Sequence, residues 1–234
     1  MRSHAVSQSP NNVPATSTTS GVNSCPLITI AIAAASLTIM ASAALTSAFQ
    51  FDRTAIAAGE LWRVFTGHLT HFDWNHFVWD AGMFVVLGVM CERRHRGRYS
   101  ICLVGSAVLI SIGLWFAHPD MSIYRGLSGI DTALFTLAAS YLLAEKWREQ
   151  DWPWVVAIIG LTVGLLAKIG FEIVTGTTFF VDSEAANFVP IPLAHAIGGL
   201  FGIVIATGGR GGRRLQAARS PRGTQPRMQV AAGN

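Results

Sequence analysis

Residues 124–144, YRGLSGIDTALFTLAASYLLA, decide the fold, because a serine between two glycines here opens a long apolar run. From residue 127 onward the run has about the 18 residues that a helix needs to cross the hydrocarbon core of a bilayer. Polar groups inside such segments are costly and usually functional. Ser128, at the mouth of this predicted span, is therefore a candidate functional residue.

The whole chain has the composition of a membrane protein. Of its 234 residues, 51% are hydrophobic and only 13% are charged, whereas about a quarter of the residues in a soluble domain are charged. This excludes an ordinary soluble domain and predicts an all-α, polytopic bundle of six transmembrane helices. The predicted spans are residues 27–49, 74–91, 100–117, 127–144, 154–175 and 189–207.

Basic residues predict the orientation of these spans. Six arginines lie without any acidic residue in the tail after residue 208, and a second block follows the second span at Arg93, Arg94, Arg96 and Arg98. Because basic connections stay in the cytoplasm, both termini are predicted to be cytoplasmic. The starts of the fourth and sixth spans then lie on the other side. We expect a multi-pass integral protein of a bacterial plasma (inner) membrane.

The two ends are predicted to lie outside the folded part. The composition predicts a disordered cytoplasmic segment at 1–24, a membrane domain at 25–208 and a disordered basic cytoplasmic tail at 209–234. Ala41-Ser42-Ala43 resembles a signal-peptidase site, but the apolar run around it is longer than a signal sequence. The tail would suit acidic lipid, and we expect no nucleic-acid partner.

A histidine opens the last predicted span, in the run PLAHAIGGLFG at residues 192–202. His195 and Ser128 thus occur at the starts of two different spans, on the same predicted side of the membrane. Together they suggest a nucleophile and its base. Taken singly, each has an ordinary interpretation, since a serine often bonds its own helix backbone and a histidine often bonds a neighbouring group.

Glycines accompany both of these residues. Gly126 and Gly129 flank the serine and permit a tight turn with close backbone approach. Gly198 and Gly202 form a small-xxx-small face, which lets two helix backbones come close together. The short side chains of a Ser–His pair need such an approach in order to meet.

A histidine-rich group surrounds the start of the second span. His68, His71, His76 and Asp80 lie there, but their spacing matches no recognised ligand pattern, so we expect no metal. Hydrogen bonding at the entrance of the span is the other interpretation for the first two histidines.

An acid and a base lie one turn apart on the fifth span, Lys168 and Glu172. A paired ion lowers the cost of insertion into lipid, so we interpret them as a structural ion pair. A role facing a substrate, as in a small transporter, is the alternative, although six spans without an internal repeat fit that class poorly.

In order and spacing, these residues resemble the rhomboid family of intramembrane serine proteases over about residues 60–207. The Lys168–Glu172 pair and the lead-in to His195 are similar to the rhombosortase branch. The resemblance rests on LWRVFT at 61–66, His71 followed by His76, Glu92-Arg93-Arg94, Gly126-Leu127-Ser128-Gly129, and Ala194-His195 followed by Gly198 and Gly202.

The resemblance implies that Ser128 is the nucleophile and His195 its general base and later acid, with no third acidic member and no cofactor. It also implies that His76 and the backbone N–H of Ser128 stabilise the oxyanion. The partners would be the lipid bilayer and transmembrane protein substrates, which are cut within or beside their transmembrane segments.

Two positions depart from the family pattern. Asp80 stands where the family often has Asn, and an ionised carboxylate would repel a developing oxyanion. Protonation through burial would remove that charge, but our hypothesis is that Asp80 pairs with His76 and holds it as an imidazolium donor. Thr132 replaces an aromatic residue and is expected to face His195, and Asp131 is a weaker candidate for orienting that ring. These departures favour, as the alternative, a catalytically inactive rhomboid-like protein that binds transmembrane clients.

Overall fold

The computed structural model describes residues 25–177 and 191–219, with side chains up to residue 208. The segment 1–24, predicted to be disordered, lies outside the described residues, as does the tail beyond residue 219. α8 continues to Arg219, whereas the sequence predicts disorder from residue 209. The elements in chain order are α1 (Leu27–Met40), α2 (Ala43–Phe49), β1 (Phe51–Asp52), α3 (Arg53–Ala57), α4 (Arg63–Thr66), the 3₁₀ helix η1 (Gly67–Leu69), α5 (Trp74–Ala117), β2 (Ile123–Tyr124), α6 (Ser128–Glu149), α7 (Trp152–Thr175) and α8 (Pro192–Arg219).

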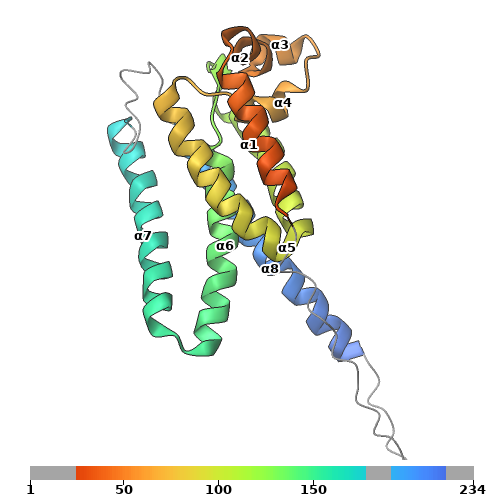
Figure 1. Cartoon of the computed structure of the whole chain (residues 1–234), viewed down its shortest axis with the longest axis vertical. Coiled ribbons are helices and arrows are strands. Elements are labelled where there is room, and N and C mark those ends of the chain that lie inside the picture. The colour runs from red at the N-terminus through yellow and green to blue at the C-terminus, as the bar shows by residue number, and fades with distance from the viewer. Residues whose placement is uncertain (1–24, 178–190, 220–234) are drawn as a thin grey trace, which may run out of the picture.

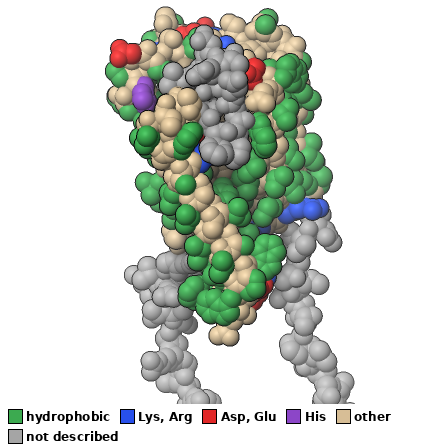
Figure 2. Space-filling view, turned by 90° about the vertical axis from the view of Figure 1, so that its left-hand side faces the viewer, with side chains coloured by type: hydrophobic (Ala, Val, Ile, Leu, Met, Phe, Trp, Pro, Cys, Tyr) green, Lys and Arg blue, Asp and Glu red, His purple; other side chains and the backbone are tan. Residues whose placement is uncertain are grey.

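α6 is the central helix of the bundle and packs against α5, α7 and α8 (Figure 1). Its buried side chains, among them Leu134 and Leu137, join those of α5 and α8 in one hydrophobic core. α7 stands at the edge, and among its residues only Val155, Ile158 and Glu172 are buried. Hydrophobic side chains cover much of the described outer surface (Figure 2), as expected of a surface that faces lipid.

The helices carry the character predicted for a membrane protein. By length and composition, two helices in the described part of the chain could cross a membrane, α5 and α7. The bent pair α1 and α2 adds a third if it counts as one span, and the apolar part of α8, Pro192–Gly208, is shorter. The described residues of the predicted spans are mainly helical, so a helical membrane protein is supported, while the number of crossings stays a prediction.

One predicted span differs in shape from the expectation. The first, 27–49, is not one helix, because the chain bends by 117° between α1 and α2. Ser42 leaves the helical conformation there, and its side chain accepts a hydrogen bond from the Leu45 N–H and so caps α2. α5 consists of two helices that meet at a kink at His95, where the backbone dihedral angles are not helical, and this break falls between the predicted second and third spans.

A short pair of strands lies within this mostly helical fold, which fits the all-α prediction. β1 and β2 pair antiparallel, with Phe51 opposite Tyr124. Arg53 follows β1, and its guanidinium donates hydrogen bonds to three carbonyl oxygens at the C-terminal end of α5. The segment that leads into Ser128 is therefore tied to the N-terminal part of the chain, which no local sequence pattern indicated.

Glu92 holds α1 against α5. Its carboxylate accepts hydrogen bonds from the backbone N–H groups of Ile28 and Thr29 and from the Thr29 hydroxyl. The N–H groups in the first turn of a helix have no partner within the helix, so a buried carboxylate stabilises that end. Gly88, one turn before Glu92, leaves room for this contact, since a Cβ there would lie 2.7 Å from the Thr29 side chain.

His68 is a structural residue of the core beneath the site. Its Nε2 lies 3.1 Å from the carbonyl oxygen of Ala107 and 3.2 Å from the Ser111 hydroxyl, and its ring packs edge-on against Tyr124. Because a carbonyl only accepts, Nε2 carries the proton. Burial lowers the pKa of His68 to about 4, against the weaker opposing effect of its backbone hydrogen bonds. The residue is therefore neutral at physiological pH.

This burial predicts an acid-sensitive fold. The unfolded chain binds a proton at His68 below pH 6.5, whereas the folded chain does so only near pH 4, so stability is lost as the pH falls through that window. The full loss is roughly 3 kcal/mol. We expect His68→Gln to reduce the fall in Tm between pH 7.5 and pH 4.5, measured in detergent. His118→Gln, an exposed histidine, is the control, and an equal effect of both substitutions would contradict this account.

Candidate functional site

Ser128 is the first residue of α6, and the turn before it is built around Gly126. Gly126 has φ +124°, a conformation that side chains rarely adopt. A Cβ on Gly126 would also lie 2.9 Å from His76 Nε2 and 3.1 Å from Asp80 Oδ2. Glycine is thus required twice, and its absence of a side chain lets the α5 residues approach the start of α6.

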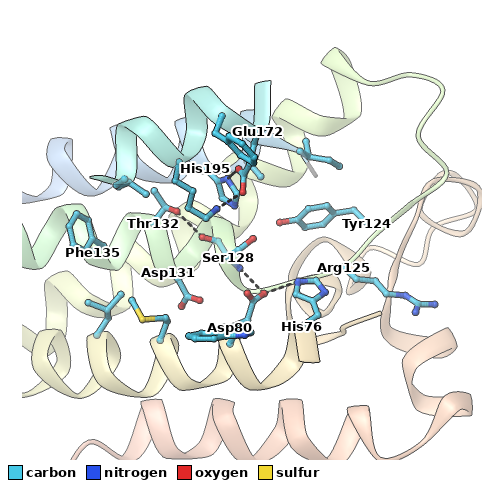
Figure 3. Close-up of a pocket in the computed structure, with 18 of the residues that line it drawn as sticks. His76, Asp80, Tyr124, Arg125, Ser128, Asp131, Thr132, Phe135, Glu172 and His195 are labelled. Atoms are coloured by element: carbon cyan, nitrogen blue, oxygen red, sulfur yellow. Dashed lines mark hydrogen bonds and ion pairs between the residues drawn. The ribbon is translucent and has the colours of Figure 1, made fainter. Parts of the chain in front are cut away.

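His195 reaches the same level as Ser128 from the first turn of α8 (Figure 3). Glycines set this register. A Cβ on Gly198 would lie 2.0 Å from the carbonyl oxygen of Gly129, and one on Gly202 would lie 2.1 Å from that of Ala133. The backbones of α6 and α8 therefore touch along these turns, in the way that small residues permit in membrane helices.

Asp80 accepts the donors nearest the serine. Its Oδ2 accepts hydrogen bonds from the backbone N–H groups of Leu127, at 2.9 Å, and Ser128, at 3.2 Å. The same oxygen lies 3.1 Å from His76 Nε2 and 3.5 Å from His71 Nε2. The predicted pairing of Asp80 with His76 is present in the structure. The sequence did not indicate that Asp80 would also bind the Ser128 N–H, which was expected to face the oxyanion.

Glu172 contacts His195 from α7, which differs from the expectation that no third acidic member is present. Its Oε2 lies 3.0 Å from His195 Nδ1, and its Oε1 pairs with Lys168 one turn earlier. The pair predicted from the sequence therefore exists, but it also reaches the histidine. The sequence indicated only that two ionisable residues lie in an apolar helix. That Glu172 contacts His195 depends on how α7 packs, which the sequence does not show.

Thr132 and Asp131 do not contact His195 in the predicted way. The Thr132 hydroxyl donates to the carbonyl oxygen of Ser128, at 2.8 Å, so the expected hydrogen bond to the histidine is not formed. Asp131 is buried, and neither of its carboxyl oxygens has a hydrogen-bond partner among the described residues. Its carboxyl group lies beside Ser128 and Asp80 (Figure 3).

These groups line one cavity of about 1060 Å³ whose walls are mostly apolar. α5 supplies Trp79, Met83 and Leu87 to one wall, and α7 supplies Leu161 and Phe171 to the other. Such a hollow, apolar with a few convergent polar groups, is the usual form of a binding site. Ser128 and His195 both line it.

Arg125 borders the cavity and was not singled out in the sequence. Its guanidinium donates to the side-chain oxygen of Gln50 and stacks over the Phe72 ring.

In the described part of the chain, no group of three or more His, Cys, Asp or Glu side chains is arranged to hold a metal ion.

Comparison with known proteins identifies the fold. The family model of the Rhomboid domain matches residues 58–210, so the resemblance seen in the sequence is confirmed at the level of the family, while the rhombosortase branch stays a prediction. A Bacillus subtilis (strain 168) protein named "Putative rhomboid protease YdcA" is 27% identical over 96 residues, which are 41% of this chain. The matched stretch spans only 47% of that relative's length.

The glycine contact between α6 and α8 predicts a sharp positional effect. We expect Gly198→Ala to push the helices apart, because its Cβ would overlap the Gly129 carbonyl. The variant should have a lower Tm, and the rate at which Ser128 reacts should fall at least tenfold. Gly170→Ala on α7, where a Cβ meets nothing within 4 Å, is the matched control. Equal behaviour of the two variants, in Tm and in reactivity toward a serine-directed probe, would show that the close contact is not needed.

Proposed function

Because this chain belongs to the rhomboid family, we propose that it is an intramembrane serine endopeptidase that cleaves transmembrane or juxtamembrane segments of other membrane proteins. One observation carries the proposal: Ser128 and His195 begin two helices that touch through glycine, and both line the same apolar cavity. A nucleophile, its base and a space for a peptide thus occur together.

In the proposed reaction, Ser128 Oγ attacks the carbonyl carbon of the scissile peptide bond and His195 takes its proton. The imidazolium then returns that proton to the leaving amine, and water hydrolyses the acyl-enzyme by the same steps. The developing oxyanion forms beside the N-terminus of α6, where the backbone N–H groups and the helix dipole favour negative charge. No cofactor takes part in this scheme.

Asp80 gives the oxyanion site its special feature. The donors proposed for the oxyanion, the Ser128 N–H and His76, both contact Asp80 Oδ2. A substrate carbonyl oxygen can use the Ser128 N–H only when this carboxylate has released it. We therefore treat Asp80 as the resting occupant of the site, paired with His76, which the substrate displaces.

The membrane arrangement follows from the same proposal. Six crossings arise if α1, the two halves of α5 on either side of His95, α6, α7 and α8 each span the bilayer. With the arginines after the second span in the cytoplasm, the site opens toward the outer side of a bacterial inner membrane. We propose with it the domain boundaries predicted from the sequence, a membrane domain at 25–208 between two cytoplasmic ends.

Substrate entry is proposed to occur from the lipid, between α5 and α7. α7 packs mainly on α6 and is mostly exposed, so the side facing α5 can admit a second chain. A helical substrate must unwind locally before its peptide bond can be attacked, since backbone groups in lipid are otherwise satisfied within the helix.

The proposal predicts that the purified protein reacts with a fluorophosphonate probe at Ser128. Ser128→Ala should abolish labelling, and His195→Ala should lower its rate at least 100-fold because the hydroxyl loses its base. Gel fluorescence measures labelling, and cleavage of a reconstituted transmembrane substrate measures proteolysis. Ser140→Ala on the same helix is the control. Labelling that persists in Ser128→Ala would refute the assignment of the nucleophile.

Asp80 also supports a second candidate function, a rhomboid-like protein that binds transmembrane clients without cutting them. A carboxylate on the Ser128 N–H opposes an oxyanion there. If the protein is an enzyme, we expect Asp80→Asn to cleave about tenfold faster at pH 7, because the amide removes the charge and can donate to the oxyanion. If Asp80→Asn cleaves more slowly than the wild type, the result would instead favour the hypothesis that Asp80 holds His76 as an imidazolium donor. A wild type and an Asp80→Asn variant that both fail to label would favour the binding protein.

A further inference from the structure

We propose that Glu172 is a positioning residue that extends the Ser128–His195 dyad into a triad. The inference rests on the proposed protease function and deepens it. For His195 to act as a base toward Ser128 through Nε2, its Nδ1 must carry the proton. Glu172 Oε2 lies 3.0 Å from that Nδ1, where a carboxylate selects this tautomer and stabilises the imidazolium that forms during attack.

The two atoms have no competing partners. Among the described residues, neither Glu172 Oε2 nor His195 Nδ1 forms a hydrogen bond, and the two atoms meet as an ion pair at 3.0 Å. Both side chains are buried, with Glu172 at 2% and His195 at 6% exposure. Within the described part of the chain, no other acceptor therefore competes with Glu172 for the N–H of His195 Nδ1.

Lys168 fixes the carboxylate in turn. It lies one turn before Glu172 on α7 and pairs with Oε1, so the other oxygen is left to face the histidine. A buried carboxylate is costly unless paired, and Lys168 offsets that cost at rest. The arrangement accounts for a feature that a structural ion pair alone does not, namely why the pair points inward at the level of His195 on a helix that is otherwise mostly exposed.

The charges around His195 come from three helices that line the cavity. They are Asp131 on α6, Lys168 and Glu172 on α7, and His76 and Asp80 on α5, and the connection between α5 and α6 adds His118, Tyr124 and Arg125 to the titratable groups of the cavity. Asp80 pairs with His71 and His76 and accepts a hydrogen bond from the Leu127 N–H before α6. Glu172 is the acid in ion-pair contact with His195, so its removal affects the imidazolium most directly.

The assignment gives α7 a direct part in the chemistry. This helix forms one wall of the cavity and also carries Glu172. The position of α7 therefore determines whether His195 has its acidic partner. One helix therefore both contacts a peptide segment that enters beside it and carries the carboxylate that pairs with the base.

The test compares Glu172→Gln and Glu172→Asp with the wild type in the full-length protein. Glu172→Gln should lower kcat for a reconstituted transmembrane substrate about 100-fold with little change in KM, since its carboxylate acts through His195. The pH midpoint of fluorophosphonate labelling should move to lower pH, because the amide no longer stabilises imidazolium. Glu172→Asp, which keeps the charge, should recover part of kcat and the wild-type midpoint.

Two further variants separate chemistry from charge and folding. Lys168→Met should lower kcat less than Glu172→Gln, because the carboxylate remains. Glu149→Gln makes the same change in the exposed Lys146–Glu149 pair of α6 and should leave kcat and the midpoint as in the wild type. Tm in detergent reports whether each variant is folded. Where a variant is less stable, the pH midpoint of labelling is measured on the protein that remains folded, and this midpoint tests the inference.

A Glu172→Gln variant with the wild-type kcat and pH midpoint would overturn the inference. The inference would also be overturned if Glu172→Gln and Glu172→Asp both lost kcat while the pH midpoint of labelling stayed unchanged. That result would indicate a structural role for Glu172. Failure of the proposed function is distinct, because the wild type itself would then show no labelling that depends on Ser128.

Discussion

The direct backbone contact between α6 and α8 is the constraint on which the rest of the site depends. Gly198 and Gly202 place α8 against the carbonyl oxygens of Gly129 and Ala133, leaving no space for even one methyl group. With that register set, the first turn of α8 carries its histidine to the start of α6. In a bilayer, where no hydrophobic effect drives helices together, such close packing is a main source of helix association. Stability and site geometry therefore come from the same few glycines.

Around this contact, two buried carboxylates each pair with groups on their own helix and with groups on other parts of the chain. Asp80 on α5 meets two histidines and the first N–H groups of α6, and Glu172 on α7 meets Lys168 and His195. Burying such groups in lipid is costly unless they are paired, so each pair also holds its helices in place. The site is in this sense part of the packing of the bundle.

Hydropathy and motif spacing predicted the parts of the fold that local sequence controls. The apolar runs become helices, and the glycines beside Ser128 and His195 take the close contacts that their small size suggested. The bend at Ser42 depends on local capping, which a hydropathy window averages away, whereas the kink at His95 falls between two spans that hydropathy had separated. The contacts of Glu172 and of Asp80 with other helices depend on tertiary packing and leave no mark in local spacing.

The two carboxylates act on the proposed reaction in opposite directions. Glu172 at His195 Nδ1 favours the imidazolium that forms when the serine attacks. Asp80 takes the Ser128 N–H that the product of that attack, the oxyanion, requires. The base is therefore prepared at rest while the oxyanion site is filled. In the proposed reaction, a peptide carbonyl that reaches Ser128 must replace Asp80 on the Ser128 N–H, so reactivity depends on a correctly seated segment more than on the serine alone.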